Sequence, residues 1–195
     1  HETTMEIARQ IVECGIGRVS LTGGEPLVRR DFMDIVDYLV SNGVRIVQIY
    51  SNGRLVTERL LDELAERGVR PEFNMSYDGD GDWHDWMRGV SGATDDVLRA
   101  FDLCREKGFP TGAEMCLHAG NIDLLRQSVN TLAAHGCSSL KTNPISPTEL
   151  WLARGEGNEI SLEQLLEAYL GYIPAYFEDG MPLTIQLGGV FACRK

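Results

Sequence analysis

The sequence lacks any long apolar run and any surplus of basic residues. No hydrophobic stretch approaches the roughly 18 residues that a membrane span needs, and nothing at its start reads as a secretory signal. Lys and Arg number 18 against 29 Asp and Glu, for a net charge of −11. Nucleic-acid-binding proteins usually carry the opposite sign, because they neutralise phosphates. We therefore expect a soluble, cytoplasmic protein that binds neither nucleic acid nor membrane. Its acidity is compatible with a basic peptide partner.

Closely spaced cysteines are also absent. The chain has five scattered cysteines: Cys14, Cys104, Cys116, Cys137 and Cys193. No pair has the spacing of a zinc or iron–sulfur motif. Single thiols of this kind are typical of a reducing compartment. The first residue is His1 and not methionine, so we expect a fragment of a longer protein.

Glycine is abundant, with 21 residues, and it follows a repeating pattern. Five times an amphipathic helix ends at a glycine and a predicted strand follows, of which residues 44–50 are apolar and β-branched. The predicted strands are residues 18–22, 44–50, 73–77, 111–117 and 139–143. A helix over 162–177 and a strand over 182–187 come later, and 146–159 is predicted to be a flexible or substrate-contacting loop. This alternation predicts an α/β fold with a parallel sheet, either an open doubly wound sheet or a complete or partial (β/α) barrel.

Unusual residues gather after the predicted strands. The loops there are residues 22–26, 51–53, 78–92, 118–120 and 144–147, whereas the opposite loops are short glycine turns. In both candidate architectures ligands bind at the carboxyl ends of the strands. Residues 78–92 form the longest loop, and long loops in compact domains tend to be functional. We therefore expect an active site at this end of the sheet.

Three short motifs in these loops carry groups that suit an amino-acid nucleoside. Gly23-Gly24-Glu25-Pro26 offers close backbone approach and a carboxylate for an ammonium group. Ser51-Asn52-Gly53 is a polar turn in which Asn-Gly favours positive φ. Ser76-Tyr77-Asp78-Gly79 ends a strand with a hydroxyl and a carboxylate that suit a ribose diol, and Arg88 can pair with a carboxylate. Each motif alone also fits a plain turn or a solvated side chain. Their ordered combination favours a binding site.

The same motifs resemble the radical S-adenosylmethionine (radical SAM) superfamily. Leu21 to Leu27, followed by Asp31-Phe32, is similar to the GGEP strand and turn of that family, and the spacing to the two later motifs also matches. The segment His84-Asp85-Trp86-Met87-Arg88-Gly89 is similar to the H-D-x-x-R-G segment of the SPASM-containing branch. That branch includes PqqE-like peptide modifiers and anaerobic sulfatase maturases. The resemblance runs from about Thr3 to about Asn143.

The resemblance implies a partial (β/α)6 TIM-like barrel with parallel strands, truncated at the first strand. It implies S-adenosylmethionine bound beside a [4Fe–4S] cluster, and a 5′-deoxyadenosyl radical that abstracts hydrogen from a peptide or protein substrate. A flavodoxin or ferredoxin would be the reductant. The resemblance implies that Gly23, Gly24 and Glu25 hold the methionyl amino group and that Pro26, beside them, belongs to the same cofactor-binding set. Ser51, Asn52, Ser76 and Asp78 would lie by the ribose and methionyl moieties, and Arg88 would face the carboxylate.

The chain departs from that family in lacking a C-x-x-x-C-x-x-C motif. We expect these cluster cysteines before His1, so that this fragment by itself would be inactive. Residues 1–145 would form the barrel core. Residues 146–195 would lead towards a SPASM domain with auxiliary iron–sulfur clusters, for which Cys193 is a weak candidate ligand and a plain thiol the simpler interpretation.

Other interpretations stay open from the residues. His84 suits a general base or an orienting residue, and His118 and Cys116 either face the substrate or pack in the core. The whole chain could instead be an unrelated (β/α) isomerase or aldolase that uses acidic residues for proton transfer. It could also be a non-catalytic barrel that binds a peptide.

Overall fold

The protein contains a six-stranded, fully parallel sheet. The computed structural model describes residues 2–146, 148–154 and 158–189. The strands follow the order of the chain from one edge to the other. They are β1 (Arg18–Leu21), β2 (Arg45–Ser51), β3 (Glu72–Ser76), β4 (Thr111–Leu117), β5 (Ser139–Pro144) and β6 (Thr184–Leu187).

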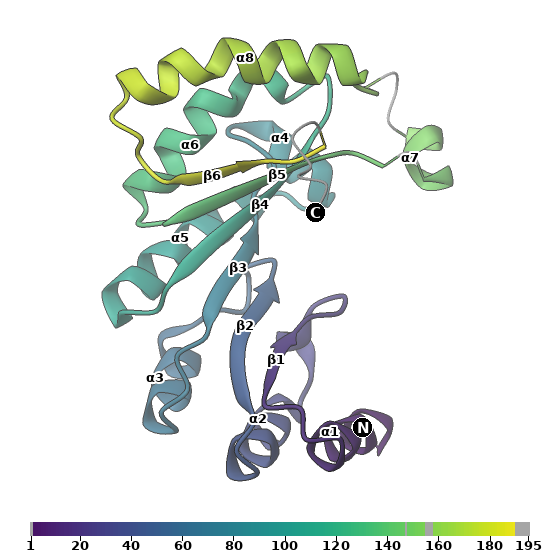
Figure 1. The fold of residues 1–195 in the computed structure, drawn as a ribbon, viewed down its shortest axis with the longest axis vertical. Coiled ribbons are helices and arrows are strands. Elements are labelled where there is room, and N and C mark those ends of the chain that lie inside the picture. Colours follow the sequence, from purple (N-terminus) through teal and green to yellow (C-terminus); the bar gives the residue numbers. More distant parts are fainter. Residues whose placement is uncertain (1, 147, 155–157, 190–195) are drawn as a thin grey trace.

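The helices of the described residues are α1 (Glu2–Glu13), α2 (Phe32–Ser41), α3 (Glu58–Glu66), α4 (Asp82–Arg88), α5 (Ala93–Lys107), α6 (Leu125–Ala134), α7 (Glu149–Arg154) and α8 (Leu162–Glu178), with 3₁₀ turns at Pro26–Val28 and Ile122–Leu124. Helices α2, α3, α5, α6 and α8 lie along the convex side of the sheet, whereas α7 lies apart from the sheet, beyond the end of β5 (Figure 1). A doubly wound sheet has helices on both faces and a reversal of strand order. This sheet has neither among the described residues, so the predicted partial barrel is confirmed.

Burial of the outer face of the sheet explains why these segments fold together. On β3, Phe73 and Met75 are fully buried and alternate with polar neighbours. Helix α5 presents Val97, Phe101 and Cys104 to the same core, at the spacing of one helical face. Apolar area removed from water is the main stabilising contribution, at roughly 25 cal/mol per Å². The core therefore lies between the sheet and its helices.

Two segments that were predicted to be loops each contain a short helix. Helix α4 lies within residues 78–92, and α7 lies within residues 146–159. Trp83, Trp86 and Met87 have the i, i+3, i+4 spacing of an apolar helical face, a signal that the loop interpretation overlooked. In α7, the Thr148 hydroxyl accepts a hydrogen bond from the backbone N–H of Trp151, as an N-terminal cap does.

The helices differ in how their first turns are capped. Thr57 caps α3, accepting a hydrogen bond from the backbone N–H of Leu60. Asp31 and Asn121 make no side-chain capping bond. Asn121 uses its side chain to join three backbone groups at the ends of β3 and β4, described below.

The chain beyond residue 145 continues the same sheet. Strand β6 pairs in parallel with β5, and α8 packs on α6. The expected boundary at residue 145 thus falls between β5 and α7. Among the described residues, no helix has both the length and the apolar character for crossing a bilayer.

Candidate active site

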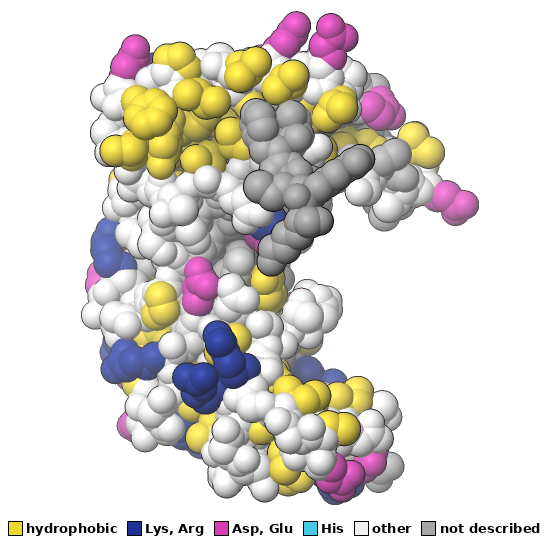
Figure 2. All heavy atoms as spheres, viewed as in Figure 1, with side chains coloured by type: hydrophobic (Ala, Val, Ile, Leu, Met, Phe, Trp, Pro, Cys, Tyr) yellow, Lys and Arg dark blue, Asp and Glu magenta, His cyan; other side chains and the backbone are white. Residues whose placement is uncertain are grey.

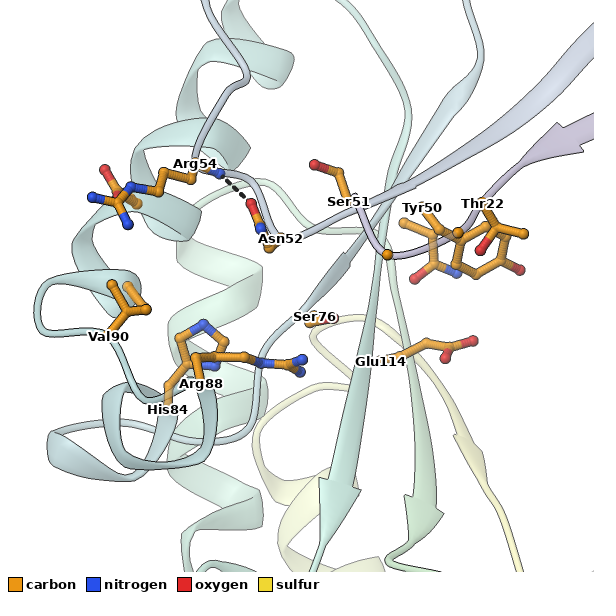
Figure 3. A pocket seen from close by; sticks show the side chains of 15 residues that line it. Thr22, Tyr50, Ser51, Asn52, Arg54, Ser76, His84, Arg88, Val90 and Glu114 are labelled. Atoms are coloured by element: carbon orange, nitrogen blue, oxygen red, sulfur yellow. Dashed lines mark hydrogen bonds and ion pairs between the residues drawn. The ribbon is translucent and has the colours of Figure 1, made fainter. Parts of the chain in front are cut away.

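A polar cavity of about 410 Å³ opens at the carboxyl ends of β1 to β4. The lining residues come from these four strands, from the loops that follow them and from the α4–α5 region. They are Thr22, Gly23, Gly24, Tyr50, Ser51, Asn52, Arg54, Asn74, Ser76, His84, Arg88, Val90, Ala93, Asp96 and Glu114. Figure 3 shows the Arg88 side chain extending towards Ser76, with Glu114 and Tyr50 on the far side. Six of the nine predicted cofactor-binding residues therefore meet at one cavity. Glu25, Pro26 and Asp78 do not line it.

Glu25 connects the first two strand-end loops. Its carboxylate accepts hydrogen bonds from the backbone N–H of Asn52 at 2.7 Å and of Leu27 at 3.1 Å. The Ser51 hydroxyl lies 3.1 Å from both carboxylate oxygens. Bonds to an ionised acceptor are among the stronger hydrogen bonds in proteins. The carboxylate thus fixes the loop after β1 against the loop after β2.

The two glycines before Glu25 leave their backbone exposed at the cavity wall. Gly23 has a φ of +148°, a conformation that side-chain-bearing residues rarely adopt. No atom outside the immediate chain lies within 4 Å of where a Cβ would stand on either glycine. Pro26 is buried and begins the 3₁₀ turn. A ligand can therefore approach the Gly23-Gly24 backbone closely.

Asp78 is a completely buried carboxylate that holds Arg88. Arg88 Nη2 lies 2.6 Å from Asp78 Oδ2, and the backbone N–H of Cys116 donates to Oδ1 at 3.0 Å. Burial alone would raise the pKa of the Asp78 carboxyl. The neighbouring His84 ring, the Arg88 charge and the Cys116 N–H outweigh burial and hold that pKa below its usual value. Asp78 lies behind Arg88, not beside the cavity where its predicted role would place it.

Two further side chains fix this arrangement. His84 is buried, and its Nδ1 accepts from the backbone N–H of Asp78 at 3.1 Å. Asn121 donates to the carbonyls of Asp78 and Cys116 and accepts from the backbone N–H of His118. These bonds join the ends of β3 and β4. His84 is thus an orienting residue in this structure.

Asp85 closes the turn between α4 and α5. It accepts from the backbone N–H groups of Thr94 at 2.8 Å and Gly92 at 2.5 Å, and from the Thr94 hydroxyl. These bonds lower the pKa of the Asp85 carboxyl. The segment that resembles H-D-x-x-R-G therefore works as a unit, in which His84 and Asp85 shape the turn that presents Arg88.

An aromatic cluster next to this unit was not anticipated from the sequence. Trp83, Trp86 and Trp151 surround His118, with ring centroids 5.2 to 5.5 Å from its imidazole. Burial lowers the pKa of His118, so the ring is neutral at pH 7. A second cavity, of about 440 Å³, shares Arg88 with the first and lies between α4 and α7, bounded by Trp86 and Trp151. His118 is therefore enclosed by indole rings.

The described cysteines are separate thiols. Burial raises the pKa of Cys104 and of Cys137 to about 12, and it also raises that of Cys116. Cys14 is exposed, and Cys193 lies outside the described residues. Within the ranges that the structure describes, no three His, Cys, Asp or Glu side chains are grouped to hold a metal ion.

A parallel partial barrel with a polar cavity at its strand ends defines a ligand-binding α/β protein of the (β/α)-barrel type. The family comparison is specific: residues 1–132 match the model of the radical SAM superfamily. The chain therefore belongs to the radical SAM superfamily. This membership excludes the unrelated isomerase or aldolase considered above. It also brings S-adenosylmethionine and a [4Fe–4S] cluster as the cofactors of the family.

Curated proteins of similar sequence are named for different products. The AdoMet-dependent heme synthase of Methanosarcina barkeri is 28% identical over 166 residues, which is 82% of this chain and 46% of that protein. The probable GTP 3′,8-cyclase of Methanopyrus kandleri is 30% identical over 90% of this chain and 50% of its own length. The chain thus spans about half the length of these curated relatives.

Solved structures share the fold. SuiB of Streptococcus suis bound to S-adenosylmethionine superposes with a TM-score of 0.70 and 16% identity, over 97% of this chain and 43% of SuiB. SuiB bound to its precursor peptide SuiA gives a TM-score of 0.71, again at 16% identity, over 93% and 40%. At this identity the match concerns the fold alone.

Proposed function

We propose that the strand-end cavity binds S-adenosylmethionine for hydrogen abstraction from a peptide or protein substrate. The observation that carries the proposal is that Arg88, fixed by buried Asp78, lines the same cavity as the exposed Gly23-Gly24 backbone. The ammonium and the carboxylate of an amino acid are attached to one carbon atom, so a site for it needs an ammonium-binding group and an anion-binding group in the same cavity. The cavity offers both, so its residues fit the methionyl end of this cofactor.

Each residue then has a stated task. The Arg88 guanidinium has five N–H donors, of which Asp78 uses part, and the rest are available to a carboxylate. The Ser76 hydroxyl lies in the same wall and can donate to the same group. The backbone carbonyls of Gly23 and Gly24 accept from an ammonium. Asn52 and Arg54 line the cavity further along and are available to a ribose or a base.

The cluster is a different case. The sequence contains no C-x-x-x-C-x-x-C motif, and the described residues include no group of three or more His, Cys, Asp or Glu side chains that could hold a metal ion. A reduced cluster beside S-adenosylmethionine would supply its one-electron cleavage and, through it, hydrogen-atom abstraction. What the present residues contribute is the binding and orientation of the methionyl group.

A peptide or protein is the substrate class that we favour. Two features support it: the segment from His84 to Gly89, which resembles the peptide-modifying branch, and the fold shared with SuiB, whose structure contains a precursor peptide. The heme synthase and GTP cyclase relatives are named for other products, so the experiment below tests the cofactor site and the activity directly.

The test uses the full-length protein, reconstituted without oxygen. Loss of a hydrogen bond to a charged group weakens binding by roughly 10- to 100-fold, so we expect Arg88→Ala to lower the affinity for S-adenosylmethionine by that factor. Arg59→Ala is the matched control, because Arg59 pairs with Glu63 on the surface of α3. Unchanged affinity in Arg88→Ala would overturn the binding proposal. Formation of 5′-deoxyadenosine with a reductant separates an enzyme from a non-catalytic peptide-binding barrel.

A further inference from the structure

The inner face of the sheet is polar along almost its whole width. The side chains of five strands that line its central hollow include Gln48, Tyr50, Glu72, Asn74, Glu114, Ser139, Lys141, Thr184 and Gln186. Parallel strands are usually apolar on both faces, and closed barrels fill their interior with branched apolar side chains. On β3 this sheet instead alternates, with Phe73 and Met75 on the helix side and Glu72 and Asn74 in the hollow. Its inner face is therefore suited to a polar ligand and not to a packed core.

The hollow is continuous with the proposed cofactor site. It has a volume of about 300 Å³ and shares Tyr50, Asn74 and Glu114 with the strand-end cavity. Figure 2 shows the molecule as a C-shaped body that is hollowed on the right in this view. A substrate group in the hollow would thus lie directly beside a ligand in the cofactor cavity.

The hollow contains more carboxylates than cationic side chains. Glu72 receives one bond, from Gln48 Nε2 at 2.8 Å, and no described cation pairs with it. Glu114 has a single ion pair, with Lys141 at 3.5 Å. Asn74 Oδ1 is buried and has no hydrogen-bond partner in the described part of the chain. The hollow therefore has two carboxylates against one ammonium, together with an unused acceptor.

Gly112 provides the space that Glu72 occupies. A Cβ built on Gly112 would lie 2.9 Å from Glu72 Oε1 and 2.8 Å from Ser139 Oγ, closer than real Cβ contacts. Any side chain there would displace the carboxylate or the neighbouring serine. The open acceptor oxygen of Glu72 thus depends on glycine at this position of β4.

We propose that this inner hollow binds a cationic, hydrogen-bond-donating group of the substrate, namely a lysine or arginine side chain of a peptide. Such a side chain supplies the positive charge that balances Glu72 and donors for Glu114 and Asn74. The peptide part of this inference rests on the proposed function. The preference for a cation rests on the lining of the hollow.

The experiment compares three small probes on the full-length protein saturated with S-adenosylmethionine. The probes are the N-acetyl, N-methylamide derivatives of lysine, norleucine and glutamate, with binding followed by NMR titration. We expect lysine to bind roughly tenfold more tightly than norleucine, and glutamate to bind least, because one charged contact changes affinity by about that factor. Equal binding of lysine and norleucine, or no binding of any probe, overturns the inference.

Variants distinguish binding of lysine in the hollow from a general attraction to the negatively charged protein. Glu72→Gln with Glu114→Gln should abolish the lysine preference, whereas Lys141→Gln should strengthen it. Glu66→Gln, on the exposed surface of α3, is the control for net charge. A preference that survives the double variant contradicts the inference. The affinity for S-adenosylmethionine is measured on the same samples, so failure of the cofactor proposal appears separately from failure of this one.

Discussion

The two faces of one sheet differ in almost every respect. On β3, Phe73 and Met75 point to the helices and are fully buried, whereas Glu72 and Asn74 point to the hollow. In a strand, neighbouring residues face opposite sides, so both faces are encoded in the same five-residue segment. The outer face supplies the stability of the barrel. The inner face and the strand ends are then free to carry polar groups that a packed core could not accept.

The largest difference between the faces should appear in stability. Phe73→Ala removes a fully buried aromatic ring and leaves a cavity, so we expect it to lower the free energy of unfolding by about 3–5 kcal/mol. Urea denaturation followed by circular dichroism measures this loss. A cost below about 1 kcal/mol would mean that the outer face is not the main source of stability.

Asp78 does not follow this division between an apolar outer face and a polar inner face, because it is a charged residue that is completely buried. Asp78→Asn would leave Arg88 without its charged partner and weaken the bond from the Cys116 N–H. We expect a loss of about 2 kcal/mol in unfolding free energy, since Arg88 is a third exposed and can still reach water. The affinity for S-adenosylmethionine should fall as well. Normal affinity in a destabilised Asp78→Asn protein would show that Asp78 does not position Arg88.

The same residue predicts how stability depends on pH. The pKa of Asp78 is lower in the folded protein than in the unfolded chain, so its stabilising contribution is complete above the unfolded value of about 3.9. That contribution is lost as the pH falls through the lower, folded value. Unfolding curves between about pH 2 and pH 5 should therefore show a smaller acid-dependent loss for Asp78→Asn than for the unaltered protein. Parallel curves for the two proteins would contradict this assignment.

The smallest effect is expected on the inner face. Gln48→Ala removes one hydrogen bond to Glu72 and contacts to Ser20 and Tyr50, all at a partly exposed surface. We expect a change in unfolding free energy within about 0.5 kcal/mol. Differential scanning calorimetry would detect a larger loss, which would mean that the polar inner face also stabilises the barrel.

Local sequence patterns predicted the alternation of strands and helices, and they selected residues that the fold brings to one cavity. The alternation of helix, glycine and strand predicted the five strands up to β5, and the motifs after β1, β2 and β3 predicted six residues of one cavity. These features depend on neighbours within a few residues. The roles of Glu25 and Asp78 depend on partners 27 and 38 residues away, Asn52 and Cys116, which no local pattern reveals.

The helix α4 and the aromatic cluster illustrate a second limit. The N-cap position of α4 is Gly81, which makes no side-chain capping bond, so the usual start signal is missing. Trp151 reaches His118 from a helix that follows β5, and only the barrel fold brings them together. The polar alternation on the inner face was present in the strands and could have been recognised from the sequence.

The most direct test is a crystal structure of the full-length protein with S-adenosylmethionine bound. We expect the methionyl carboxylate to accept hydrogen bonds from Arg88 and Ser76, and the methionyl ammonium to donate to the backbone of Gly23 and Gly24. Methionyl density anywhere else, such as between Trp86 and Trp151 with Arg88 still paired only to Asp78, would contradict it.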